Sequence, residues 1–170
     1  MQAYNEKNSI TNIVPRIPTK ETFFKRRAEI KLEQSLIFPG YIFVETPLNS
    51  DDFIYYTKGL NRMSRNFIKI LRYDSTGEMA LSYEEKFPLI QTLDHGWCIK
   101  ASRGFKKNGT AKIIDGGLAG NEVLIKEIDW HRMAAWIEVE ILGKKKIHKI
   151  GLQYFEPPDD ERASLTFFIF

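Results

Sequence analysis

Residues 110–155 read TAKIIDGGLAGNEVLIKEIDWHRMAAWIEVEILGKKKIHKIGLQYF, a series of short apolar runs separated by turn residues. Ile137, Val139 and Ile141 alternate with glutamates, which is the period of two expected of a strand with one buried face. We therefore predict five short strands, over residues 110–114, 123–129, 135–141, 146–150 and 152–155. Five short strands in so few residues predict a small β-barrel.

The first half of the chain has longer apolar and charged runs. Its most apolar stretch is LIFPGYIFV, residues 36–44, whose β-branched and aromatic residues predict a strand buried on both faces or nearly so. Because proline cannot donate to a strand ladder, that strand is expected to begin at Tyr41, just after a bend. Another strand is predicted over residues 67–72, and the charged stretch 20–31 is interpreted as the exposed connection of a hairpin.

Two helices are also predicted in this half. At Ser50 a capping hydroxyl precedes two aspartates, which the helix dipole favours. The spacing of Ser82 and Glu85 is that of a capping box, and Pro88 is expected to kink or shorten the helix that follows. Together with the strands, these helices predict an α+β protein. The composition changes between residues 93 and 109, where we place a domain boundary.

Composition and charge narrow the possible functions. The chain has 170 residues, a net charge of only +3 and one cysteine, so a nucleic-acid surface requires local clustering and a disulfide framework is excluded. There is no apolar run of membrane-spanning length and no signal-peptide core, so we expect a cytoplasmic protein. His95 and Cys98 are spaced like metal ligands, but no second pair completes a zinc site. Without a catalytic or phosphate-binding motif, we expect neither an enzyme nor a cofactor.

Two segments resemble motifs of one protein family, in the family's order. Residues 36–44 resemble the FPGYxFV signature in the N-terminal (NGN) domain of NusG-type transcription factors. Residues 116–143, beginning GGLAGNE and continuing through AAWIEV to Gly143, resemble the KOW motif of the same family. The residues between these segments resemble the LoaP branch of specialised antiterminators. The resemblance covers residues 13–156.

The resemblance implies an incomplete NGN-type α/β sandwich over residues 1–95, a linker over 96–108, a small SH3-like KOW barrel over 109–156 and a tail over 157–170. It implies a factor for transcription elongation and antitermination that has no catalytic activity. Its NGN domain would bind the clamp helices of bacterial RNA polymerase, and its KOW domain would bind nascent RNA, including an RNA hairpin. In the alternative, the KOW domain binds a ribosomal or termination protein.

The sequence departs from the family pattern in three places. The opening WYV strand and long helix of the family are absent before Ile13-Val14-Pro15, the family's GPL reads Gly116-Gly117-Leu118, and Val123 replaces a glycine. We therefore expect a truncated form, an internal start or a sheet completed by a partner. A truncated member would act only as a KOW module for RNA or protein. The apolar residues 165–170 are expected to cover the sheet edge left by the missing strand.

The resemblance assigns polymerase binding to Phe38, Tyr41 and Phe43, with ordinary core packing as the alternative. Lysines after Gly143 predict phosphate contacts, with a solvated hairpin tip as the alternative. Trp130 is expected to stack on a base or to pack on the barrel. For the basic residues 25–27 a solvated loop is preferred over a nucleic-acid contact. The predicted RNA-binding residues are Lys112, Lys126, His131, Arg132, Lys144, Lys145, Lys146 and Lys149.

Overall fold

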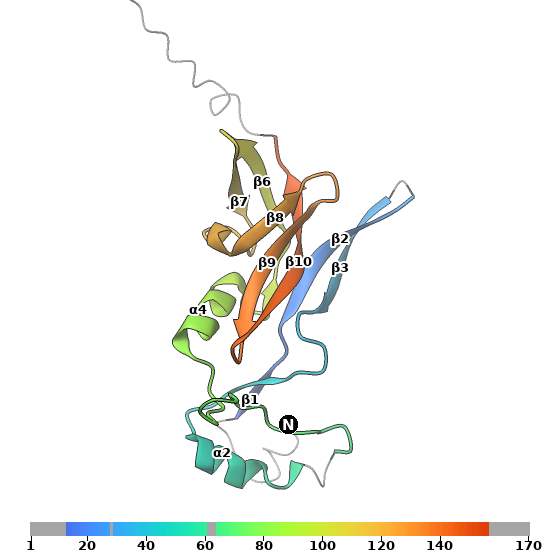
Figure 1. Ribbon diagram of the computed structural model, residues 1–170. Helices are drawn as coiled ribbons and strands as arrows, with labels where there is room; N and C mark the ends of the chain where they lie inside the picture. The colour runs from blue at the N-terminus through green and yellow to red at the C-terminus, as the bar shows by residue number, and fades with distance from the viewer. Residues whose placement is uncertain (1–12, 28, 61–63, 157–170) are drawn as a thin grey trace, which may run out of the picture.

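The computed structural model describes residues 13–27, 29–60 and 64–156, which form an α+β protein, as predicted (Figure 1). Among these residues the strands form sheets of five, three and two strands. The strands are β1 (Val14–Arg16), β2 (Thr19–Arg26), β3 (Glu29–Leu36), β4 (Phe43–Glu45), β5 (Cys98–Ile99), β6 (Ser102–Lys107), β7 (Thr110–Asp115), β8 (Ile125–Asp129), β9 (Ala134–Ile141) and β10 (Lys144–Tyr154). The helices are α2 (Ser50–Thr57), α4 (Tyr83–Thr92) and the short 3-10 helix η1 (Glu122–Leu124).

The five-stranded sheet has the order β7-β6-β10-β9-β8 and curls into a half-barrel (Figure 1). In β9 the side chains of Ala135, Ile137 and Val139 are buried while those between them are partly exposed, so the predicted period of two is confirmed. The two strands predicted over 146–150 and 152–155 are instead one strand, β10. Its first part pairs with β9 and its last residues pair with β6, so the ladder is continuous.

Glycines permit close backbone approaches at two places in this sheet. Gly151 lies within β10, and a Cβ there would be only 3.0 Å from the Cβ of Ala101 and 3.1 Å from the ring of Phe23, so glycine leaves room for these side chains. Gly116 has φ +87°, and a Cβ on it would lie 2.4 Å from the carbonyl oxygen of Ala101. The GGLAGNE segment therefore folds tightly over the β5–β6 connection, which requires glycine at its start.

The charged stretch that was interpreted as a hairpin connection is the hairpin itself. β2 and β3 pair antiparallel along eight residues each, from Thr19 opposite Leu36 to Arg26 opposite Glu29, and β5 adds in parallel at the base of β2. Every residue of β3 is exposed. The interpretation failed because alternating charged and apolar residues also suit a strand pair that is solvated on much of its surface.

Two strand predictions in the first half are wrong. Residues 41–44 do not form a strand buried on both faces, because β4 begins at Phe43, pairs with β1 among the described residues, and leaves Ile42 58% exposed. Residues 67–72 lie outside the three sheets, and Ile68 is 86% exposed. Apolar runs become strands only where a neighbouring backbone satisfies their hydrogen bonds.

Both predicted helices form, with differences at their ends. The cap of α2 is Asn49 rather than Ser50, and its side chain accepts a hydrogen bond from Asp52 N. Ser82 caps α4 and accepts a hydrogen bond from Glu85 N, but Ser82 N donates to the hydroxyl of Tyr73, so only one half of the predicted capping box forms. The helix continues from Pro88 to Thr92, so the proline does not end it. None of the helices in the described ranges is long and apolar enough to cross a membrane.

One buried cluster connects the two halves of the chain. Ile37 and Phe38 lie in the same core as Leu89 of α4 and as Ile137 and Ile150 of the five-stranded sheet. The stretch 96–108, predicted as a linker, contains β5 and β6, which belong to different sheets. The division into domains stays a prediction, and the tail at 157–170 lies outside the described residues.

Candidate polymerase and nucleic-acid interface

The three aromatic residues assigned to polymerase binding lie together but differ in exposure. Phe38 is only 4% exposed and belongs to the buried core, so its burial favours the core-packing alternative. Phe43 is half-buried, and its ring centroid is 5.3 Å from that of Phe38. Tyr41 is 40% exposed and is the member of the set that offers most aromatic surface to a partner.

Strand β10 brings two of its residues against these aromatics. The Nζ atom of Lys146 lies 4.9 Å from the centroid of the Tyr41 ring, which is within cation–π distance. The imidazole of His148 meets the ring of Phe38 edge to face at 4.9 Å. Residues that the sequence assigned to different partners therefore adjoin. We call Phe38, Tyr41, Phe43, Lys146 and His148 the aromatic junction.

His148 is the buried titratable group of the junction. Its side chain is 7% exposed, and its Nε2 atom has no hydrogen-bond partner among the described residues. Burial, together with the positive charges of Lys20 and Lys146, lowers the pKa of His148 from 6.5 to about 4. The imidazole is therefore neutral at neutral pH.

The β9–β10 turn at the lysine run is held by a buried carboxylate. Glu85 of α4 accepts hydrogen bonds from Gly143 N at 2.7 Å and from Leu142 N at 3.1 Å. Both turn residues have positive φ (53° and 71°), a conformation in which consecutive N–H groups form an anion-binding nest. The hydroxyl of Tyr73 donates to the same carboxylate. The pKa of Tyr73 is raised, mainly by burial and in second place by this hydrogen bond. We call these hydrogen bonds of Glu85 to the turn the clasp; they fix the position of the backbone directly before Lys144 to Lys146.

The lysines near the turn are partly neutralised by acidic neighbours. Glu138 lies 3.1 Å from Lys145 Nζ and 3.6 Å from Lys126 Nζ, and the pKa of Glu138 is lowered, first by its hydrogen bond with Lys145. Lys144 lies 4.0 Å from Asp74 in an exposed ion pair. Lys149 is half-buried. The pKa of Lys20 is lowered, first by the burial of Lys20 and second by the positive charge of Lys149. The cations around β10 therefore act beside carboxylates that would weaken phosphate binding.

The other predicted RNA-binding residues do not join this surface. His131 and Arg132 lie in the turn before β9, and Lys144 follows the turn after it, so the eight residues of β9 separate them by about 25 Å. Lys112 lies on the edge strand β7 with its Nζ 5.7 Å from the ring of Phe105. The sequence pattern grouped these residues because it could not place the ends of the strands.

Trp130 packs within the fold, which was one of its two expected roles. Its ring meets that of Tyr154 edge to face at 5.6 Å, and it lies against the buried core. Sequence reasoning also missed Tyr73 and saw in Glu85 only a helix cap. The only sequence signal for the role of Glu85 was its position in a capping box before an apolar helix. That signal could not reveal its hydrogen-bond donors, Leu142 N and Gly143 N, which lie 57 and 58 residues away.

The described residues offer no group of three or more His, Cys, Asp or Glu side chains that would hold a metal ion. Cys98 is buried in β5 and His95 is exposed in the preceding turn, so the two sequence neighbours differ in surroundings. No protein-family model matches the chain, and no curated protein matches it.

Proposed function

We propose that this protein is a NusG-type transcription elongation and antitermination factor. In this proposal Tyr41 and its neighbours bind bacterial RNA polymerase, and the lysines of β10 bind nascent RNA. The α+β fold and the two motif segments, residues 36–44 and 116–143, support the proposal. The proposed NGN-type part is residues 1–95, and the proposed KOW part is residues 109–156, which include β7, β8, β9 and β10 of the curled sheet.

The observation that carries the proposal is the contact of Tyr41 with Lys146. It gives one exposed surface an aromatic side chain of the kind that anchors protein interfaces and a cation of the kind that neutralises phosphate. A factor that holds polymerase and the emerging transcript together needs these two chemistries side by side. Such a factor would favour the elongating state of polymerase by binding it better than the paused state.

Replacing Tyr41 tests the polymerase half of the proposal. The full chain is titrated with the clamp-helix fragment of a bacterial RNA polymerase, and Tyr41→Ala is expected to raise Kd about tenfold because an exposed aromatic anchor is lost. The matched control is Tyr83→Ala, which removes a 63% exposed tyrosine from α4. Equal affinities for the two variants would contradict the assignment of Tyr41.

Replacing the lysine run tests the RNA half. The triple variant Lys144→Gln, Lys145→Gln, Lys146→Gln is expected to weaken binding of an RNA hairpin and to lower the salt slope by about 2, because up to three phosphate contacts are lost. Glu138→Gln should act oppositely and strengthen binding, since it frees two of the cations. The slope is measured by fluorescence anisotropy at several salt concentrations.

A control of equal charge separates a local contact from the effect of net charge. The variant Lys58→Gln, Lys69→Gln, Lys86→Gln removes three exposed lysines that do not belong to β10 and should bind RNA as the parent does. If both triple variants weaken binding equally, β10 is not the RNA site. RNA binding by a folded chain that does not bind polymerase would favour the alternative of a KOW module acting alone.

A further inference from the structure

The β2–β3 hairpin extends beyond the half-barrel as an arm (Figure 1). Its base lies beside β5 and β10, whereas Phe24 to Arg26 of β2 and all of β3 are exposed. The two strands run to Arg26 opposite Glu29, and Arg27 at the tip has φ 57°. The arm therefore presents side chains from both of its faces to solvent in its distal half.

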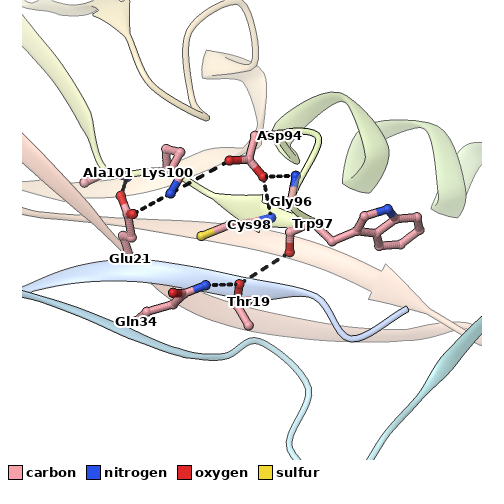
Figure 2. Close-up of polar contacts among 9 residues, drawn as sticks. All are labelled: Thr19, Glu21, Gln34, Asp94, Gly96, Trp97, Cys98, Lys100 and Ala101. Carbon is pink, nitrogen blue, oxygen red and sulfur yellow. Dashed lines mark hydrogen bonds and ion pairs between the residues drawn. The ribbon is translucent and has the colours of Figure 1, made fainter. Parts of the chain in front are cut away.

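Polar contacts fix the base of this arm (Figure 2). The carboxylate of Glu21 accepts hydrogen bonds of 2.9 Å from Lys100 Nζ and from Ala101 N, and the hydrogen bond with Glu21 is the largest cause that raises the pKa of Lys100. Thr19 N donates to Trp97 O, and Gln34 Nε2 donates to Thr19 Oγ1. Because both strands are held at their base, the distal residues keep a defined position relative to the sheet.

One face of the distal arm combines an aromatic ring with cations. Phe24 is 50% exposed and stands directly opposite Lys31, while Arg26 follows two residues further on the same face. Arg26, Arg27, Glu29 and Lys31 line a hollow of about 440 Å³ at the tip. The tip carries four cations, of which Lys25 lies on the opposite face, and the carboxylate residue Glu29 stands directly opposite Arg26 on the face of Phe24. The ion pair of Lys31 with Glu29 at 3.5 Å is exposed and therefore weak.

We propose that this arm binds single-stranded nucleic acid, with a base stacked on Phe24 and the neighbouring phosphates on Arg26 and Lys31. An exposed aromatic ring flanked by cations is the arrangement by which proteins bind unpaired strands without sequence preference. A duplex keeps its bases stacked on each other and offers Phe24 no free base. This site is separate from the lysines of β10, so it goes beyond the proposed function and stands or fails independently of it.

The test uses the full chain and a short unstructured uridine oligoribonucleotide. Phe24→Leu keeps an apolar side chain of similar size, and it is expected to weaken binding about tenfold with an unchanged salt slope because stacking is lost. Phe24→Tyr keeps the ring and should bind as the parent does. Arg26→Gln with Lys31→Gln should lower the salt slope by about 1.4. Melting temperatures within one degree or so of the parent establish that the variants are folded.

Three comparisons make the outcome decisive. The substitutions in the β2–β3 arm should weaken binding of the oligoribonucleotide by the same factor when Lys144 to Lys146 are already replaced by glutamine, because the two sites are separate. An oligodeoxyribonucleotide of thymidines tells whether the arm distinguishes RNA from DNA. Binding of a duplex, including any at the lysines of β10, should be insensitive to Phe24→Leu. Parent-like affinity of Phe24→Leu, or equal losses for duplex and single strand, would overturn the proposal.

Discussion

Glu85→Ala is expected to destabilise the protein by about 3 kcal/mol and to lower Tm by roughly 6–12 °C. The substitution leaves the N–H groups of Leu142 and Gly143 and the hydroxyl of Tyr73 without their shared acceptor. Leu142 also loses the carboxylate that stabilises a left-handed φ of 53°, a conformation costly for a residue with a Cβ. The measurement is thermal and urea unfolding followed by circular dichroism.

Two variants define what this result would mean. Glu85→Gln keeps one oxygen that can accept from the turn, so it should cost about 1 kcal/mol. Glu84→Gln removes the neighbouring exposed carboxylate and should change stability by less than about 0.5 kcal/mol. A loss for Glu84→Gln as large as for Glu85→Ala would mean that the helix dipole, and not the clasp on the turn, is responsible.

The second large effect is a dependence of stability on pH that arises from His148. Its pKa is about 4 in the folded protein and about 6.5 in an unfolded chain, so the unfolded state binds more protons between these values. The stabilisation is complete above pH 6.5 and is lost as the pH falls towards 4. Its full size is about 3 kcal/mol, because protonation would place a charge in a buried site and near the positive charges of Lys20 and Lys146.

His148→Phe separates this histidine from other titrating groups. The variant has no proton to bind at this position, so its free energy of unfolding should change less than that of the parent between pH 6.5 and 4.5. Carboxylates such as Asp115 and Glu138, whose pKa values are lowered by hydrogen bonds from Arg103 and Lys145, act in both proteins and at lower pH. Equal pH slopes for parent and variant in this window would contradict the assignment to His148.

The sequence predicted best those elements whose stabilising pattern is local. The alternation of Ile137, Val139 and neighbouring residues predicted β9, and the hydroxyl of Ser82 predicted the start of α4. The alternation in β9 and the cap of α4 both depend on residues that are only a few positions apart in the sequence. The α+β class followed from the same local patterns, without knowledge of which strands pair.

Pairing and burial across the chain decided the rest. The apolar residues 41–44 were expected to be interior, but β4 is short and Ile42 is exposed, because the available partner among the described residues is the three-residue β1. The charged stretch 20–31 had the composition of a loop and forms two paired strands, since each satisfies the other's backbone hydrogen bonds. Neither outcome follows from the character of the residues alone.

The sequence by itself determined an α+β chain with a strand-rich second half, a capped helix at Ser82 and the two motif segments on which the proposed function depends. Only the tertiary structure decided that Tyr41 meets Lys146, that Glu85 clasps the turn before the lysines, and that His131 and Arg132 lie at the far end of β9. Local periodicity is set by neighbouring residues, whereas these contacts join residues that are distant in sequence. They depend on strand register and shared burial, which the whole chain fixes at once.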